Sequence, residues 1–265
     1  MSASESVFFP SAGARLHAAR HAGGSGRPLV VVPGITTPAG GIACAAERLA
    51  AIARDVYVLD MGGRGLSERV GFGAHRAGEY AEDVLALIDH ADLDRPLLVG
   101  HSLGARVVAH DRSRFPGYSA GVVAIDPPMS GPGRRPYPMG LDRFVNRIHG
   151  ARAREHYPTW TDAQVAERGR WLDSCDEVAV IESYAWFHLE AFEPVRQEVE
   201  PPALLLFGAD SPVVTHADAA TLERLNPRAR VVSVPSSGHM IPWDNLEQMA
   251  REIEAFTAEL GHFSS

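Results

Sequence analysis

The chain has 265 residues, which is enough for one large domain or for a core domain that carries an insertion. Its net charge of −8 and pI of about 5.8 argue against a nucleic-acid partner, because such a protein needs a basic face. All 25 basic residues are arginine, so a Schiff-base lysine and a P-loop lysine are both excluded.

The two cysteines, Cys44 and Cys175, are too few for a disulfide framework or a cysteine metal site, and we expect neither a metal nor an organic cofactor. No apolar run approaches the roughly 20 residues of a membrane helix. The first nine residues lack the basic and apolar regions of a signal peptide. These features predict a cytoplasmic protein with no membrane partner.

Short apolar runs alternate with helix-like segments along most of the chain. Two opening runs, 5–9 and 15–21, predict a hairpin at a sheet edge. Runs rich in Val, Leu and Ile predict buried strands at 27–34, 55–60, 95–102, 120–127, 202–210 and 229–235. Helices are predicted at 41–53, 77–92, 103–114, 216–225 and 243–260. This alternation predicts an α/β fold with a mostly parallel sheet flanked by helices.

Residues 136–194 interrupt the alternation, because they contain helix-like, aromatic-rich segments and no buried-strand run. Thr161 precedes one of these segments and is a plausible N-cap. We therefore expect a core formed by 1–135 and 195–265, with 136–194 inserted as a helical lid.

The sequence "VGHSLGAR" contains a G-x-S-x-G motif where a predicted strand meets a predicted helix. A serine at such a turn stands clear of the sheet with a helix N-terminus beneath it, which suits a nucleophile. The hydroxyl of Ser102 needs a base, and His239 follows the last predicted strand at the same sheet edge. His101 comes directly before the serine, and we expect its side chain to point away from the site.

Acyl transfer also requires donors for the developing oxyanion, and backbone N–H groups are the usual ones. We predict the N–H of Leu103, after the serine, and the N–H of Ile35, in the loop that follows the first long strand. The imidazole needs a carboxylate as well. Both Asp126 and Asp210 end predicted strands at this edge, and their spacing does not choose between them.

Five stretches carry a family resemblance: "VVPGITTPA", "YVLDMGGRGLS", "VGHSLGAR", "DPPMSGPGRRPYP" and "SGHMIPWDNL". The chain resembles the α/β-hydrolase superfamily over essentially its whole length, and more narrowly the N-formylmaleamate deformylases of bacterial nicotinate degradation. In that family the acid opens the D-P-P stretch, so the resemblance implies a triad of Ser102, Asp126 and His239. One departure is Gly62, where relatives usually carry an arginine; here Arg64 follows instead.

The resemblance implies hydrolysis of N-formylmaleamate to maleamate and formate, without a cofactor. A small carboxylate substrate needs a cation and a pocket, and our candidates are Thr36, Arg134, Arg135, Trp160, Trp186, His188 and Met240. Alternatives on the same triad are an esterase, a lactonase, a carbon–carbon hydrolase or a hydrolase of related N-acyl enamides, and the fold also serves non-catalytic ligand receptors. The sequence leaves the oligomeric state open, a homo-oligomer included.

Overall fold

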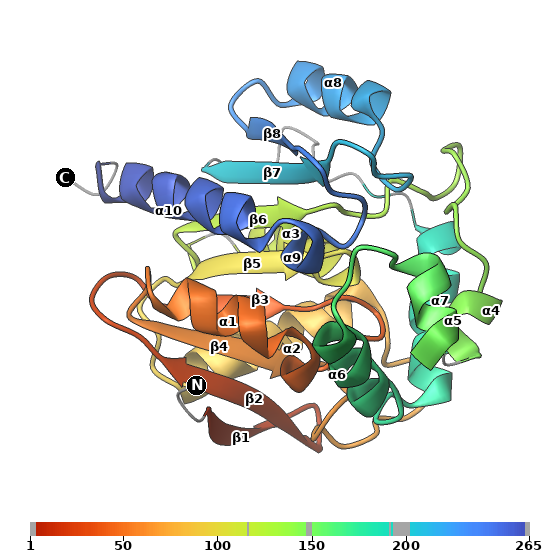
Figure 1. The fold of residues 1–265 in the computed structure, drawn as a ribbon. Helices are drawn as coiled ribbons and strands as arrows, with labels where there is room; N and C mark the ends of the chain where they lie inside the picture. The colour runs from red at the N-terminus through yellow and green to blue at the C-terminus, as the bar shows by residue number, and fades with distance from the viewer. Residues whose placement is uncertain (1–3, 116, 147–149, 191, 193–201, 263–265) are drawn as a thin grey trace.

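The computed structural model describes residues 4–115, 117–146, 150–190, 192 and 202–262. Its sheet has eight strands in the order β1-β2-β4-β3-β5-β6-β7-β8 (Figure 1). The strands are β1 (Glu5–Ser11), β2 (Ala14–Ala22), β3 (Leu29–Val32), β4 (Asp55–Asp60), β5 (Leu97–His101), β6 (Gly121–Ile125), β7 (Ala203–Gly208) and β8 (Arg230–Val234). Strands β3 to β8 pair in parallel, whereas β2 pairs antiparallel with both β1 and β4. The predicted mostly parallel α/β sheet and its edge hairpin are confirmed.

Helices cover both faces of the sheet, which explains why its central strands are continuous apolar runs. Side chains of α1 (Ala43–Ala50) and α10 (Leu246–His262) pack on one face with Leu29 and Val31 of β3. Side chains of α2 (Ala77–His90), α3 (Leu103–Arg114) and α8 (His216–Leu225) pack on the other face with Val30 and Val32. None of the helices in the described ranges is long and apolar enough to cross a membrane.

Four further helices, α4 (Asp142–Val145), α5 (Gly150–His156), α6 (Asp162–Leu172) and α7 (Glu177–Leu189), lie between β6 and β7 in the sequence. Figure 1 shows them grouped together beyond one end of the strands rather than on a face of the sheet. Thr161 caps α6 in a full capping box with Gln164, as its position predicts. We call α4 to α7 the helical insertion. The expected return to the core at residue 195 lies outside the described residues.

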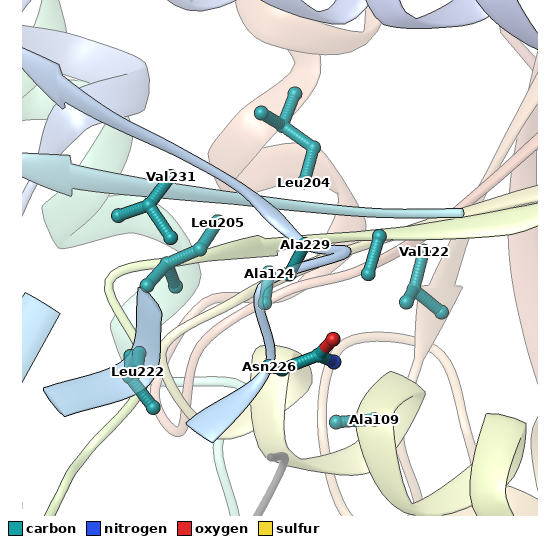
Figure 2. A pocket seen from close by; sticks show the side chains of 10 residues that line it. Ala109, Val122, Ala124, Leu204, Leu205, Leu222, Asn226, Ala229 and Val231 are labelled. Atoms are coloured by element: carbon teal, nitrogen blue, oxygen red, sulfur yellow. The ribbon is translucent and has the colours of Figure 1, made fainter. Parts of the chain in front are cut away.

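Two short helices lie at the strand ends where the insertion sits: η1 (Ala39–Ile42) after β3 and α9 (Ile241–Asp244) after β8. A separate apolar pocket lies between α3, α8 and strands β6 to β8 (Figure 2). Ten residues line it: Ala109, Val122, Ala124, Ala203, Leu204, Leu205, Leu222, Asn226, Ala229 and Val231. This lining contains no titratable side chain, so we treat the pocket as a packing feature of the core.

Candidate active site

The turn from β5 into α3 holds Ser102 in a strained conformation with φ of 54°. The flanking glycines are required by close backbone approach. A Cβ on Gly104 would overlap the carbonyl of Val32, and a Cβ on Gly100 would overlap the backbone of Gly104. The packing of β3, β5 and α3 therefore requires glycine on both sides of the serine, and the tight turn presents its hydroxyl at the end of the strand.

Asp126 follows β6 directly and is fully buried, with φ of 46°. The backbone N–H of Gly208 donates to its Oδ1 at 3.1 Å, and the Ser211 hydroxyl donates to its Oδ2 at 2.6 Å. A buried carboxylate needs such donors to offset its desolvation. Pro127 and Pro128 come next and cannot extend the strand, so the chain leaves the sheet at this point.

His239 lies between the serine and this carboxylate. Its Nδ1 is 2.7 Å from Asp126 Oδ2, and its Nε2 is 3.0 Å from Ser102 Oγ. Asp210, the other acid that the spacing allows, is exposed, and its own backbone N–H donates to the Ser237 carbonyl. The structure therefore brings Asp126, and not Asp210, into contact with the imidazole.

His101 does not point away from the site, contrary to our expectation. Its Nε2 lies 2.9 Å from the backbone carbonyl of His239, and the two rings are 5.1 Å apart. Burial, reinforced by the nearby His239, lowers the pKa of His101 to about 3. The ring is therefore neutral and donates from Nε2–H to the His239 carbonyl. We call residues 235–240, between β8 and α9, the histidine loop. The bond from His101 holds this loop against the end of β5.

The loop after β3 passes beside the nucleophile, because an ideal Cβ on Gly34 would lie 3.4 Å from Ser102 Cβ. The N–H of Thr37 donates to the Gly34 carbonyl at 3.0 Å and closes a turn. Among the residues described, no protein acceptor bonds to the N–H of Ile35 or Leu103, although both residues are buried. We call residues 34–37 the oxyanion loop, after the role that the sequence predicts for the Ile35 N–H.

Arg64, the arginine that follows the departure at Gly62, bonds to several separate segments of the chain. Its side chain is fully buried and donates to the carbonyls of Ile35 (3.2 Å), Gly62 (2.9 Å) and Ala179 (3.1 Å). Further bonds go to the hydroxyls of Tyr80 and Ser183. At position 62 itself a Cβ would lie 2.9 Å from Val70, which leaves little room for a larger side chain. The arginine at 64 thus ties the oxyanion loop to α7.

Tyr137 is a further buried residue near the nucleophile that the sequence did not indicate. Burial raises the pKa of its phenol; the negative charge of Asp126 adds to this rise, and an interaction with Ser102 opposes it. Its oxygen has no hydrogen-bond partner of good geometry within the described ranges. The ring packs on Phe187, with centroids 4.9 Å apart. No local pattern marks a tyrosine between two prolines as a site residue.

A cavity of about 1220 Å³, which includes space open to solvent, adjoins His239. Met240, Tyr157 and Arg143 are among its lining residues. The lining does not include Arg134, Arg135, Trp160, Trp186 or His188. No group of three or more metal-ligating His, Cys, Asp or Glu side chains occurs in the part of the chain that is described.

Several substrate-binding candidates have other contacts. Arg134 is exposed, and the exposed Arg135 pairs with Asp218 at 2.9 Å. Trp160 stacks on Trp243 and packs with Met240. The remaining three are Trp186, whose ring lies 4.2 Å from the Arg106 guanidinium; His188, which is exposed; and Thr36, whose hydroxyl is bonded by Arg168.

The parallel sheet, the strained serine and the adjacent histidine and carboxylate have the arrangement that serine hydrolases use. The sequence profile of the alpha/beta hydrolase family matches residues 29–253. The chain belongs to this family and is a hydrolase.

Two curated relatives match much of the chain. An N-formylmaleamate deformylase from Pseudomonas putida is 38% identical over 243 residues, covering 89% of this chain and 90% of the relative. A 2-(acetamidomethylene)succinate hydrolase from Mesorhizobium japonicum is 29% identical over 205 residues, covering 69% and 71%. The crystal structure of an N-formylmaleamic acid deformylase from Pseudomonas putida superposes with a TM-score of 0.86 at 32% identity, covering 94% of this chain and all of that one.

Proposed function

We propose that the chain is a deformylase that hydrolyses N-formylmaleamate to maleamate and formate, with Ser102 as nucleophile, His239 as base and Asp126 as acid. The observation that carries this proposal is the position of the His239 ring, 3.0 Å from Ser102 Oγ and 2.7 Å from Asp126 Oδ2. The 38% identity to a deformylase over most of both chains supports the substrate.

In the first half-reaction Ser102 Oγ attacks the formyl carbon, and its proton passes to His239 Nε2. The negative charge that develops on the formyl oxygen is received by the N–H groups of Ile35 and Leu103. The carbon–nitrogen bond then breaks, and His239 returns the proton to the leaving nitrogen. Maleamate departs and a formyl ester remains on Ser102.

In the second half-reaction water attacks the formyl ester while His239 removes its proton. The tetrahedral intermediate collapses, Ser102 Oγ recovers a proton from His239, and formic acid leaves and loses its proton to solvent as formate. Asp126 keeps the imidazole in the tautomer with hydrogen on Nδ1 and stabilises the imidazolium in both halves. Every proton transfer to or from Ser102 and the leaving nitrogen passes through His239, and we propose no cofactor.

Recognition of the substrate carboxylate requires a cation at the cavity. Among our sequence candidates, Arg135 already pairs with Asp218, and neither it nor Arg134 lines the cavity. Arg143 does line it, and its guanidinium lies 5.7 Å from the Tyr157 ring centroid. We therefore propose Arg143 in place of Arg134 and Arg135 as the carboxylate ligand, with Met240 on the same wall.

The decisive measurement is formate release by the purified chain from N-formylmaleamate, run beside a neutral aryl ester. We expect formate release that falls by at least about 1000-fold in Ser102→Ala, because the nucleophile and base act as a unit. Ester cleavage without formate release would keep the serine hydrolase but reject this substrate. Formate release that persists in Ser102→Ala would reject the mechanism.

A further inference from the structure

One face of helix α6 contacts α9, which follows the histidine loop, and η1, which follows the oxyanion loop. Gln164, Arg168 and Trp171 are spaced by four and three residues, which places them on the same helix face. Gln164 Nε2 donates to the Trp243 carbonyl in α9 at 3.4 Å. The Trp171 ring lies so close to Gly40 in η1 that a Cβ there would overlap it. Helix α6 thus bridges the segment after the catalytic histidine and the segment after the oxyanion loop.

Arg168, at the centre of this face, holds Thr36 at two points. Its Nη1 donates to the Thr36 carbonyl at 2.8 Å, and its Nη2 donates to Thr36 Oγ1 at 2.7 Å. Nη1 is also 3.4 Å from Thr37 Oγ1. These partners are neutral, and no carboxylate in the described ranges forms an ion pair with Arg168. Its planar fork therefore fixes the geometry of the loop rather than neutralising an acid.

The preceding residue, Ile35, is held by Arg64, whose Nε donates to the Ile35 carbonyl at 3.2 Å. The other end of this buried guanidinium bonds to Ala179 and Ser183 in α7. Ile35 and Thr36 are therefore each bonded by a guanidinium group, and each group connects the oxyanion loop to the helical insertion. The N–H of Ile35 belongs to the residue that Arg64 contacts and is next to the residue that Arg168 contacts, and it is the donor that the proposed mechanism needs.

We propose that Arg168 is a positioning residue for the oxyanion hole, so that docking of helix α6 sets the orientation of the Ile35 N–H. The inference rests on the Ser102 chemistry proposed above, but not on the identity of the substrate. A displacement of about 1 Å in a catalytic group can cost roughly 100-fold in rate. The two bonds to Thr36 limit such a displacement.

An arginine near an active site could instead bind the carboxylate of the substrate, and the two roles predict different kinetics. An oxyanion hole serves every acyl substrate, charged or neutral, and acts on kcat because its bonds strengthen in the transition state. A carboxylate ligand serves only acidic substrates and acts mainly on KM. A neutral aryl ester therefore separates positioning from substrate binding.

The test compares Arg168→Met with Arg170→Met for N-formylmaleamate and for the neutral ester. Arg170 is the matched control because it lies on the same helix, is exposed, and pairs only with Glu167, at 3.0 Å, among the described residues. For Arg168→Met we expect kcat to fall by roughly 10- to 50-fold on both substrates, with KM within about threefold. Arg170→Met should stay within twofold of wild type, and Arg168→Lys should recover part of kcat because an ammonium can still bond one Thr36 oxygen.

Unchanged kcat for Arg168→Met on both substrates would overturn the inference, and so would a rise in KM confined to N-formylmaleamate. Absence of formate release by the wild type rejects the proposed deformylase, yet the ester still tests the positioning role.

The rate at which a fluorophosphonate labels Ser102 gives a substrate-independent reading, and we expect slower labelling in Arg168→Met. If that variant does not fold, Thr36→Val removes one bonded oxygen and should lower kcat on the ester by several-fold; no change would again overturn the inference.

Discussion

Two regions of the molecule contain a serine, a histidine and an aspartate in the same hydrogen-bonded order. In one, His239 Nδ1 is 2.7 Å from Asp126 and Nε2 is 3.0 Å from Ser102. In the other, His17 Nδ1 is 2.7 Å from Asp60 and Nε2 is 3.1 Å from Ser6. The interatomic distances alone do not tell the two sets apart.

The surroundings of the two serines differ. Ser102 occupies a strained turn ahead of a helix, and the loop that begins at Gly34 passes beside it. Ser6 lies exposed in an ordinary strand, where it pairs with Ala19 in the β1–β2 hairpin. The second set therefore joins the edge hairpin to the sheet, and its serine lies within a strand rather than in a strained turn ahead of a helix. A catalytic set requires a presented nucleophile and oxyanion donors in addition to the three side chains.

The largest expected effect is a difference in kcat between variants of Asp126 and Asp210, the two aspartates that follow strands at the sheet edge near Ser102. Asp126→Asn should lower kcat by roughly 10⁴-fold, because an amide stabilises the wrong tautomer of the imidazole and cannot stabilise the imidazolium. Asp210→Asn is the comparison: Asp210 is exposed at the cavity, but the His239 Nδ1 bonds Asp126, so kcat should stay within about threefold. Both are measured as turnover of whichever acyl substrate the wild type accepts. Loss of activity in Asp210→Asn alone would show that the acid has been assigned to the wrong residue.

A second variant tests the structural role of the other set. Asp60 accepts the N–H of Ala39 at 2.6 Å and the N–H of Leu66 at 3.0 Å, besides the bond with His17. Asp60→Asn weakens three bonds to a buried carboxylate and should lower the free energy of unfolding by about 2–4 kcal/mol, as measured in urea. The kcat of the remaining folded enzyme should change by less than tenfold.

The serine of that set provides the control. Ser6→Ala should lower the free energy of unfolding by less than about 1 kcal/mol, because the hydroxyl is at the surface. If Asp60→Asn lost as much kcat as Asp126→Asn at full stability, the contrast between a structural set and a catalytic set would not hold.

Local sequence patterns predicted the sheet, the helices and two of the three residues in the proposed triad. Buried parallel strands are continuous apolar runs, and the G-x-S-x-G turn has a strict glycine requirement, so both leave a local signal. The choice between Asp126 and Asp210 was different, because both residues end strands and only the resemblance favoured the former. Packing of β6 beside β5 and β7 places Asp126 at the imidazole.

Contacts between distant segments explain what the sequence could not predict. Arg168 and Thr36 are 132 positions apart, and one arginine among 25 basic residues carries no mark of such a bond. The side chain of His101 is expected to point away from the site. It instead reaches the histidine loop, which is more than 130 positions away in the sequence. Both contacts join a helix or strand to a loop from a distant part of the chain, and no local pattern predicts such a contact.

A third buried carboxyl group, that of Asp83, has fewer hydrogen-bond donors among the described residues than Asp60 or Asp126, and the pH dependence of stability tests what this difference does. Asp83 in α2 receives a hydrogen bond from the Ser11 hydroxyl at 2.6 Å, and within the described part of the chain no backbone N–H donates to it as one does to Asp60 and Asp126. Burial raises its pKa to about 7, the charges of Glu82 and Glu79 add to the rise, and the Ser11 bond opposes it. The folded protein therefore keeps a proton on Asp83 at pH values where the unfolded chain, near 3.8, has lost it.

Because the folded state keeps this proton across the window, the contribution of Asp83 to stability falls as pH rises from about 4 to 7, by a total on the order of 4 kcal/mol. Asp83→Asn keeps an acceptor for Ser11 but cannot ionise, so its advantage over wild type in urea unfolding should grow between pH 5 and pH 7.5. Asp89→Asn, an exposed change on the same helix, should show no such growth. An equal difference from wild type at both pH values would mean that Asp83 is ionised in the folded protein, so that a single hydroxyl donor suffices for a buried carboxylate here.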